Sequence, residues 1–226
     1  MKRIVGLTLL SSRKCKIREF RTSWSAVQTT KLLHAERQDG RPAFNFMSLR
    51  RLSVSVVRFK DELNIRYLLQ NAKLLEELHL EVAYGQSIVG FLLPSPRTLR
   101  VLDLRAFLSA DSNSVVLGGF CEELEALAGH NMLEALSFTV RVFALEEKDF
   151  VGSSIQNLEK VLVKPGWPAL RQISLKISIK RGIGSWKDSA ELCEALQFLP
   201  DKYLSHLSNL ESVAFDYSAH VVRDEF

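Results

Sequence analysis

The chain has 226 residues, of which 46% are apolar and 25% charged, with 11 Gly, 6 Pro and a formal net charge of +4. The low Gly and Pro content excludes collagen-like and Gly/Pro-rich disordered proteins, and the apolar content is sufficient for a folded core. The length suits one large domain or one continuous array of repeats.

The cysteines and histidines predict neither disulfides nor a metal site. Cys15, Cys121 and Cys193 lie far apart and form no CxxC pair. An odd, sparse set is typical of a reducing compartment, so we expect a cytoplasmic or nuclear protein. The five histidines show no ligand spacing with the cysteines, and we expect no metal or other cofactor. No apolar run approaches the ~18 residues of a membrane span, so no membrane partner is expected.

The first 46 residues are expected to form a basic segment of strand and helix, an atypical or truncated first repeat. Ile4 to Leu10 imitates the apolar stretch of a signal peptide, but Arg13, Lys14 and Lys16 follow where small residues belong. We therefore interpret residues 4–10 as a strand.

The charge is unevenly distributed along the chain. Residues 1–60 carry 14 Lys and Arg against three acids, whereas the remaining 166 residues carry 16 basic and 23 acidic ones. Such a basic end could bind nucleic acid or an acidic partner surface, or it could be a solvated chain end. We favour the solvated end, do not expect nucleic acid as the partner, and keep binding through this region as the alternative function.

Residues 47–226 repeat one pattern, Leu-x-x-apolar-x-apolar. The first leucines of successive copies lie 26, 24, 34, 37 and 40 residues apart. The two shortest spacings match leucine-rich repeats of 20–29 residues, and the longer ones are expected to extend the helices and loops. The copies are Leu49/Leu52/Val54, Leu75/Leu78/Leu80, Leu99/Leu102/Leu104, Leu133/Leu136/Phe138, Leu170/Ile173/Leu175 and Leu210/Val213/Phe215, with a seventh at Ile4/Leu7/Leu9.

The context of these copies, more than the triplet itself, indicates the fold, because Leu makes up 36 of the 226 residues. Helical periodicity follows most copies, over residues 63–69, 120–127, 150–162 and 189–196. A repeated order of turn, strand and helix predicts parallel strands joined by covering helices. We therefore predict an α/β fold, an irregular leucine-rich-repeat-like solenoid with parallel strands on one face and helices on the other. Turn formers precede most copies: Asn71, Pro96, Asn131, Pro168 and Asn209.

Three copies carry a resemblance to a known family. Leu75-Glu76-Glu77-Leu78-His79-Leu80, Leu99-Arg100-Val101-Leu102-Asp103-Leu104 and Leu170-Arg171-Gln172-Ile173-Ser174-Leu175 resemble the irregular leucine-rich repeats of fungal F-box proteins. The resemblance implies the substrate-recognition arm of a cullin-type ubiquitin ligase. No segment here matches the Leu-Pro-x-Glu-like opening of an F-box, since Leu199-Pro200-Asp201 is interpreted as a helix break. A ligase adaptor is therefore expected as a partner only if an F-box lies upstream.

No arrangement of residues in the sequence predicts catalysis. Phosphate-binding loops, Gly-x-Ser-x-Gly and His-Glu-x-x-His are missing. Adjacent glutamates such as Glu122-Glu123 point about 100° apart on a helix, so we expect them on a solvated face. His79 and Asp103 occupy the same slot of neighbouring repeats and could hydrogen-bond, most simply as an exposed pair. We therefore predict that the protein is not an enzyme.

The strand face that alternates with the buried positions is the candidate binding surface. Its mixture of small, polar and charged residues of both signs suits a contact with an unidentified protein. The predicted function is thus a non-catalytic protein-interaction module. The predicted partner-binding residues are Arg51, Glu77, His79, Glu81, Asp103, Arg105, Gln172, Lys176 and Asp216.

Overall fold

The computed structural model describes residues 15–16, 18–22, 44–56, 59–82, 92, 97–109, 113–129, 131–143, 150–180 and 189–222. The strand predicted over residues 4–10, with the seventh repeat copy, lies outside the described residues. Most of the basic amino-terminal segment lies outside them as well.

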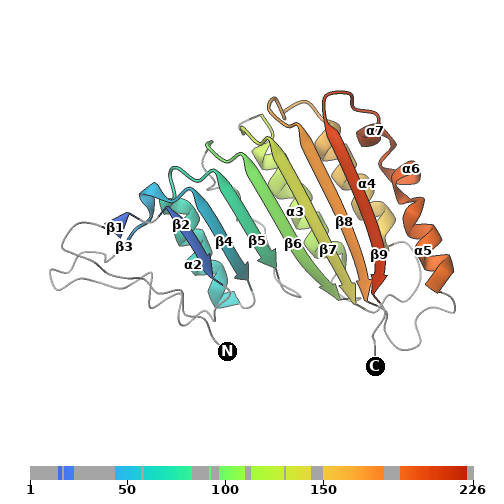
Figure 1. The fold of residues 1–226 in the computed structure, drawn as a ribbon, viewed down its shortest axis with the longest axis horizontal. Helices are drawn as coiled ribbons and strands as arrows, with labels where there is room; N and C mark the ends of the chain where they lie inside the picture. Colours follow the sequence, from blue (N-terminus) through green and yellow to red (C-terminus); the bar gives the residue numbers. More distant parts are fainter. Residues whose placement is uncertain are drawn as a thin grey trace.

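In the described part of the chain, seven parallel strands form one sheet, in which the order of the strands in space is their order in the chain (Figure 1). Parallel neighbours need a crossover, and here each crossover leads to the next position in the sheet. This arrangement confirms the predicted α/β fold with a leucine-rich-repeat-like order of elements. The strands are β2 (Glu19–Thr22), β4 (Arg51–Val56), β5 (Glu77–Val82), β6 (Val101–Ser109), β7 (Ala135–Phe143), β8 (Gln172–Lys180) and β9 (Ala214–Val222).

A second sheet pairs β1 (Cys15–Lys16) with β3 (Phe44–Asn45) in parallel. A short 3-10 helix, η1 (Phe46–Ser48), then leads into β4. Because β2 pairs with β4, the part of the amino-terminal segment that forms β2 continues the main sheet.

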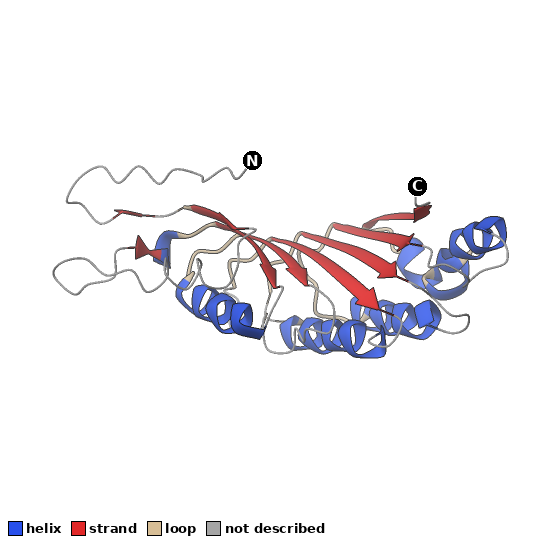
Figure 2. Cartoon of the chain, turned by 90° about the horizontal axis from the view of Figure 1, so that it is seen from below, coloured by secondary structure: helices blue, strands red, loops and turns tan. Residues whose placement is uncertain are grey.

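The helices lie on one face of the sheet only, as Figure 2 shows for the described residues. The predicted helices over residues 150–162 and 189–196 match α4 and α5 to within one residue. The other two predictions were too short at their beginnings: α2 begins before residue 63, and α3 begins before residue 120. The helices are α2 (Phe59–Asn71), α3 (Asn113–Leu127), α4 (Phe150–Val163), α5 (Ser189–Gln197), α6 (Leu199–Tyr203) and α7 (Ser205–Ser208).

The repeat leucines stack in register across the sheet and form the centre of the core. The second template residues of the first five copies lie opposite one another on successive strands, and each is at most 1% exposed. Full burial of such a side chain stabilises the fold by roughly 1.5–3 kcal/mol before ordering costs. These five residues are Leu52, Leu78, Leu102, Leu136 and Ile173.

The sixth copy is displaced by two residues from the predicted register. Phe215 lies opposite Ile173, whereas Val213 was predicted to do so. Val213 instead precedes β9, and its backbone N–H donates to the carbonyl of Leu210 at 3.3 Å in a turn. Because the displacement is even, the same side chains still face the core.

Asparagines end three of the helices. The side-chain amides of Asn71, Asn131 and Asn209 each donate to the backbone carbonyl four residues earlier, at 2.7, 2.8 and 2.7 Å. The last carbonyls of a helix have no partner within the helix, so these bonds satisfy them where the chain turns toward the next strand. All three were among the predicted turn formers.

Two glutamates on the helical side are buried, which corrects the expectation of a solvated face for Glu123. Glu123 of α3 is 1% exposed, and its carboxylate accepts the backbone N–H of Leu92 at 2.6 Å. Glu159 of α4 accepts the backbone N–H groups of His206 and Leu207 at 2.8 and 3.3 Å. Both carboxylates therefore tie a distant segment to a helix through backbone groups that would otherwise lack partners.

Two glycines with positive φ join the ends of α3 and α4. Gly129, with φ +80°, follows α3, and its N–H donates to the carbonyl of Gly166 at 2.8 Å. Gly166, with φ +139°, follows α4, and its carbonyl also accepts the side-chain amide of Asn131 at 3.1 Å. Side-chain-bearing residues rarely adopt such φ values, so the junction depends on glycine.

We expect Gly166→Ala to lower the free energy of unfolding by about 2–3 kcal/mol, measured by chemical denaturation. A Cβ there would add backbone strain and would lie 3.0 Å from both the Ala128 Cβ and the Gly129 nitrogen. Gly129→Ala is the matched control, because its Cβ would meet no atom within 4 Å. The control should cost only about 1–2 kcal/mol, and equal losses in the two variants would contradict the predicted clash.

Candidate functional site

The open face is the side of the seven-stranded sheet that faces away from the helices (Figure 2). It is formed by the strand residues that alternate with the buried core positions. All nine residues predicted to bind a partner lie on its strands, in β4, β5, β6, β8 and β9. Strand alternation alone was therefore enough to choose the face.

Cross-strand polar contacts fix several side chains of the open face. Arg51 Nε lies 3.0 Å from Glu77 Oε1, directly across from β4 to β5. Further along the same pair of strands, Ser55 Oγ donates to Glu81 Oε2 at 3.4 Å. Ion pairs this exposed contribute about 0–1 kcal/mol each, so they hold side chains in place more than they stabilise the fold.

Asp103 is buried and lies at the centre of a polar cluster on this face. Its Oδ2 lies 3.1 Å from His79 Nδ1 and accepts from Arg105 Nη2 and Nε at 3.0 and 3.3 Å. The predicted contact between His79 and Asp103 is confirmed, but the pair is not an ordinary exposed one, since the Asp103 side chain is only 12% exposed. A buried carboxylate needs such partners to offset its lost hydration. These contacts therefore hold the side chains of His79 and Arg105 in place around the Asp103 carboxylate.

We expect Asp103→Asn to lower the free energy of unfolding by about 1–2 kcal/mol, less than for a fully buried charge because Arg105 and His79 are half exposed. The amide would present a donor to Arg105, which has only donors. Asp216→Asn is the control, because Asp216 is exposed and contacts only the Ser174 hydroxyl, at 3.3 Å, among the contacts described. Denaturation midpoints of the two variants check this, and an effect no larger than the control's would disprove it.

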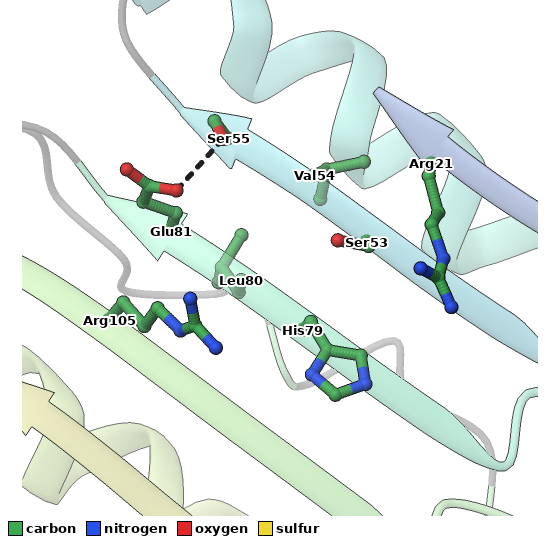
Figure 3. A pocket seen from close by; sticks show the side chains of 8 residues that line it. All are labelled: Arg21, Ser53, Val54, Ser55, His79, Leu80, Glu81 and Arg105. Carbon is green, nitrogen blue, oxygen red and sulfur yellow. Dashed lines mark hydrogen bonds between the residues drawn. The ribbon is translucent and has the colours of Figure 1, made fainter. Parts of the chain in front are cut away.

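A shallow hollow of about 260 Å³ lies on the open face over β2, β4, β5 and β6 (Figure 3). It brings together three of the predicted residues: His79, Glu81 and Arg105. Gln172, Lys176 and Asp216 lie on β8 and β9, at the far side of β7, and do not line it. The lining residues are Arg21, Ser53, Val54, Ser55, His79, Leu80, Glu81 and Arg105.

The sequence prediction missed Arg21, because no repeat copy had been placed on β2. A weaker signal was present: Ile17 and Phe20 have the spacing of the first two template residues, with Thr22 in place of the third. Phe20 indeed lies opposite Leu52 in the sheet. A template that allowed a polar residue at one of its three positions would have predicted β2.

Part of the basic excess of residues 1–60 is matched by carboxylates. Arg21, Arg50 and Arg51 lie 2.6, 2.7 and 3.0 Å from glutamate oxygens, and the last two partners belong to the following repeat. The other basic residues before residue 44 lie mostly outside the described residues. The alternative function through the basic end stays a prediction.

Over the described ranges, no three or more His, Cys, Asp and Glu side chains gather as a metal site would require. Nor is any helix there long and apolar enough to cross a membrane.

The thiol of Cys121 is a poor nucleophile near neutral pH. Burial on α3 is the largest cause that raises its pKa, to about 11, and the nearby Glu125 and Glu122 raise it further. The thiolate is the reactive form of cysteine, so a raised pKa protects the residue from oxidation and alkylation.

In a Cys15→Ala/Cys193→Ala background, we expect Cys121 at pH 8 to react with iodoacetamide about 100-fold more slowly than the same thiol in urea-unfolded chain. The rate in the folded protein should keep rising about tenfold per pH unit until the pH nears 11, because the thiolate fraction does so. Mass spectrometry over a pH series measures both rates. Equal rates in folded and unfolded protein would refute the shift.

Comparisons of the chain with protein-family models, with curated proteins and with solved structures found no match.

Proposed function

We propose that the protein is a non-catalytic interaction module that binds a protein partner on the open face. The observation that carries this proposal is the one-sided covering of the sheet (Figure 2). Parallel sheets are normally covered on both faces. A parallel sheet on which the described helices cover one face only offers a broad surface that a partner can cover.

The chemistry of the open face supports a protein partner. Contacts such as Arg51 with Glu77 and Asp103 with Arg105 hold charged side chains in fixed positions before any partner arrives. Preorganised side chains lose less conformational entropy on binding. The charges of both signs and the many hydroxyls are typical of polar interface rims.

The resemblance of the repeats to those of fungal F-box proteins supports a finer proposal: the open face receives the substrate of a ubiquitin ligase. Recruitment of a ligase adaptor would require an F-box joined to this array. Purification of the full natural gene product, followed by a search for the bound adaptor, tests this finer proposal separately from the binding face.

We expect a photoreactive phenylalanine analogue in place of Ser137, on the open face in β7, to form discrete adducts with one protein in an extract of the source cells. The same analogue in place of Gln156, exposed on α4, is the matched control on the helical side. Adducts that depend on the open face should appear with the first probe and be absent or diffuse with the second. Mass spectrometry identifies them, and identical adducts from both probes would reject the proposed binding face.

A further inference from the structure

The distal rows are the two rows of open-face residues that follow Asp103 and Asp216 toward the carboxyl ends of β6 to β9. Their eight positions hold cations, hydroxyls, an imidazole and one aromatic ring, and none is acidic. This composition follows from the register of the strands alone, so it does not depend on residues outside the described ranges. The rows are Arg105, Thr139, Lys176 and Ser218, and then Phe107, Arg141, Ser178 and His220.

Two exposed cations of the distal rows differ from Arg105, which pairs with Asp103. Arg141 lies over the ring of Phe107, with Cζ 5.3 Å from the ring centroid. Lys176 lies on the next strand, one row nearer to Asp216. In the part of the chain that the structure describes, neither cation has a carboxylate within ion-pair distance. A guanidinium group held against an aromatic ring still presents N–H groups at its rim, so Arg141 is positioned for a carboxylate.

Further hydrogen-bond donors lie beside the two cations. Ser178 lies between Arg141 and His220 in its row and is only 8% exposed. Its hydroxyl has no partner among the contacts described. A buried hydroxyl without a partner costs free energy, which an acceptor group of a ligand would recover. His220 is exposed and carries a ring N–H in both its neutral and its charged form, so it can donate in either state.

We propose that the distal rows bind a short acidic segment of the protein partner, whose Asp or Glu carboxylates contact Arg141 and Lys176. The inference rests on the proposed function and adds the charge of the segment that the open face binds. Asp103 and Asp216 lie in the adjoining row, so only a short anionic stretch fits between them and the strand ends. A nucleic-acid duplex carries one negative charge per ~1.7 Å of its axis and would extend over these two acids.

The first test selects ligands from a phage-displayed random peptide library on the full chain at low ionic strength. We expect the retained peptides to be enriched in Asp and Glu. Replacing the acids of a retained synthetic peptide by Asn and Gln should weaken its binding about tenfold. The affinity of the unchanged peptide should fall as salt is added, because salt screens exposed charges.

Variants of the chain locate the contact. Lys176→Glu should weaken the acidic peptide about tenfold, because it replaces attraction by repulsion. Arg141→Gln removes one charge and should weaken it about fivefold. Lys160→Glu is the matched control, because it changes the net charge as Lys176→Glu does but lies exposed on α4, on the helical side. It should change the dissociation constant less than about twofold. Thermal unfolding of each variant checks that the fold is retained.

Each outcome decides the inference independently of the binding face. Acidic peptides that lose affinity in Lys176→Glu and Arg141→Gln, but not in Lys160→Glu, support it. Retained peptides without acids, equal losses in Lys176→Glu and Lys160→Glu, or tighter binding of a random-sequence oligonucleotide than of the peptide overturn it. A selection that retains no peptide overturns it as well, including where acids of this chain outside the described residues occupy the distal rows. The photoreactive probe at Ser137 then shows separately whether the open face still binds a partner.

Discussion

The structure depends on one constraint: equivalent apolar side chains must stack in register from each parallel strand to the next. The row from Leu52 to Ile173 satisfies it with almost complete burial. Since side chains alternate along a strand, placing one row in the core places its neighbours on the open face. Moving any strand by a single residue would bury charges such as Glu77 and expose the leucines.

The sequence therefore determined much of the fold and the choice of face, because both follow from local apolar spacing. Leu78 and Leu80 identified the core side of β5, and His79 with Glu81 were assigned correctly to the opposite side. The predicted register of the sixth repeat copy was wrong, because Leu210 and Val213 match the template although they lie in the turn before β9. Apolar spacing by itself does not distinguish a strand from the turn before it.

The details of the candidate site were less accessible to sequence analysis, because they depend on tertiary partners. The burial of Asp103 follows from two side chains that enclose its carboxylate, and one of them, His79, lies 24 residues away. Glu123 is buried because a backbone N–H 31 residues away in sequence reaches it. In both cases the residue type alone favoured a solvated charge. The hollow is also lined by Arg21 of β2. This strand was not predicted, because Thr22 replaces the apolar residue at the third template position.

The agreement between the order of strands in space and in the chain has a consequence for how such a protein can change over evolutionary time. The first five repeat copies are spaced 24 to 37 residues apart, yet their strands keep the same template register. The additional residues are accommodated between strands, so insertions there need not disturb the side chains displayed on the sheet. Each repeat also packs mainly on its immediate neighbours, so a substitution is felt over a short range. The displayed surface can thus diversify one residue at a time while the scaffold beneath it is preserved.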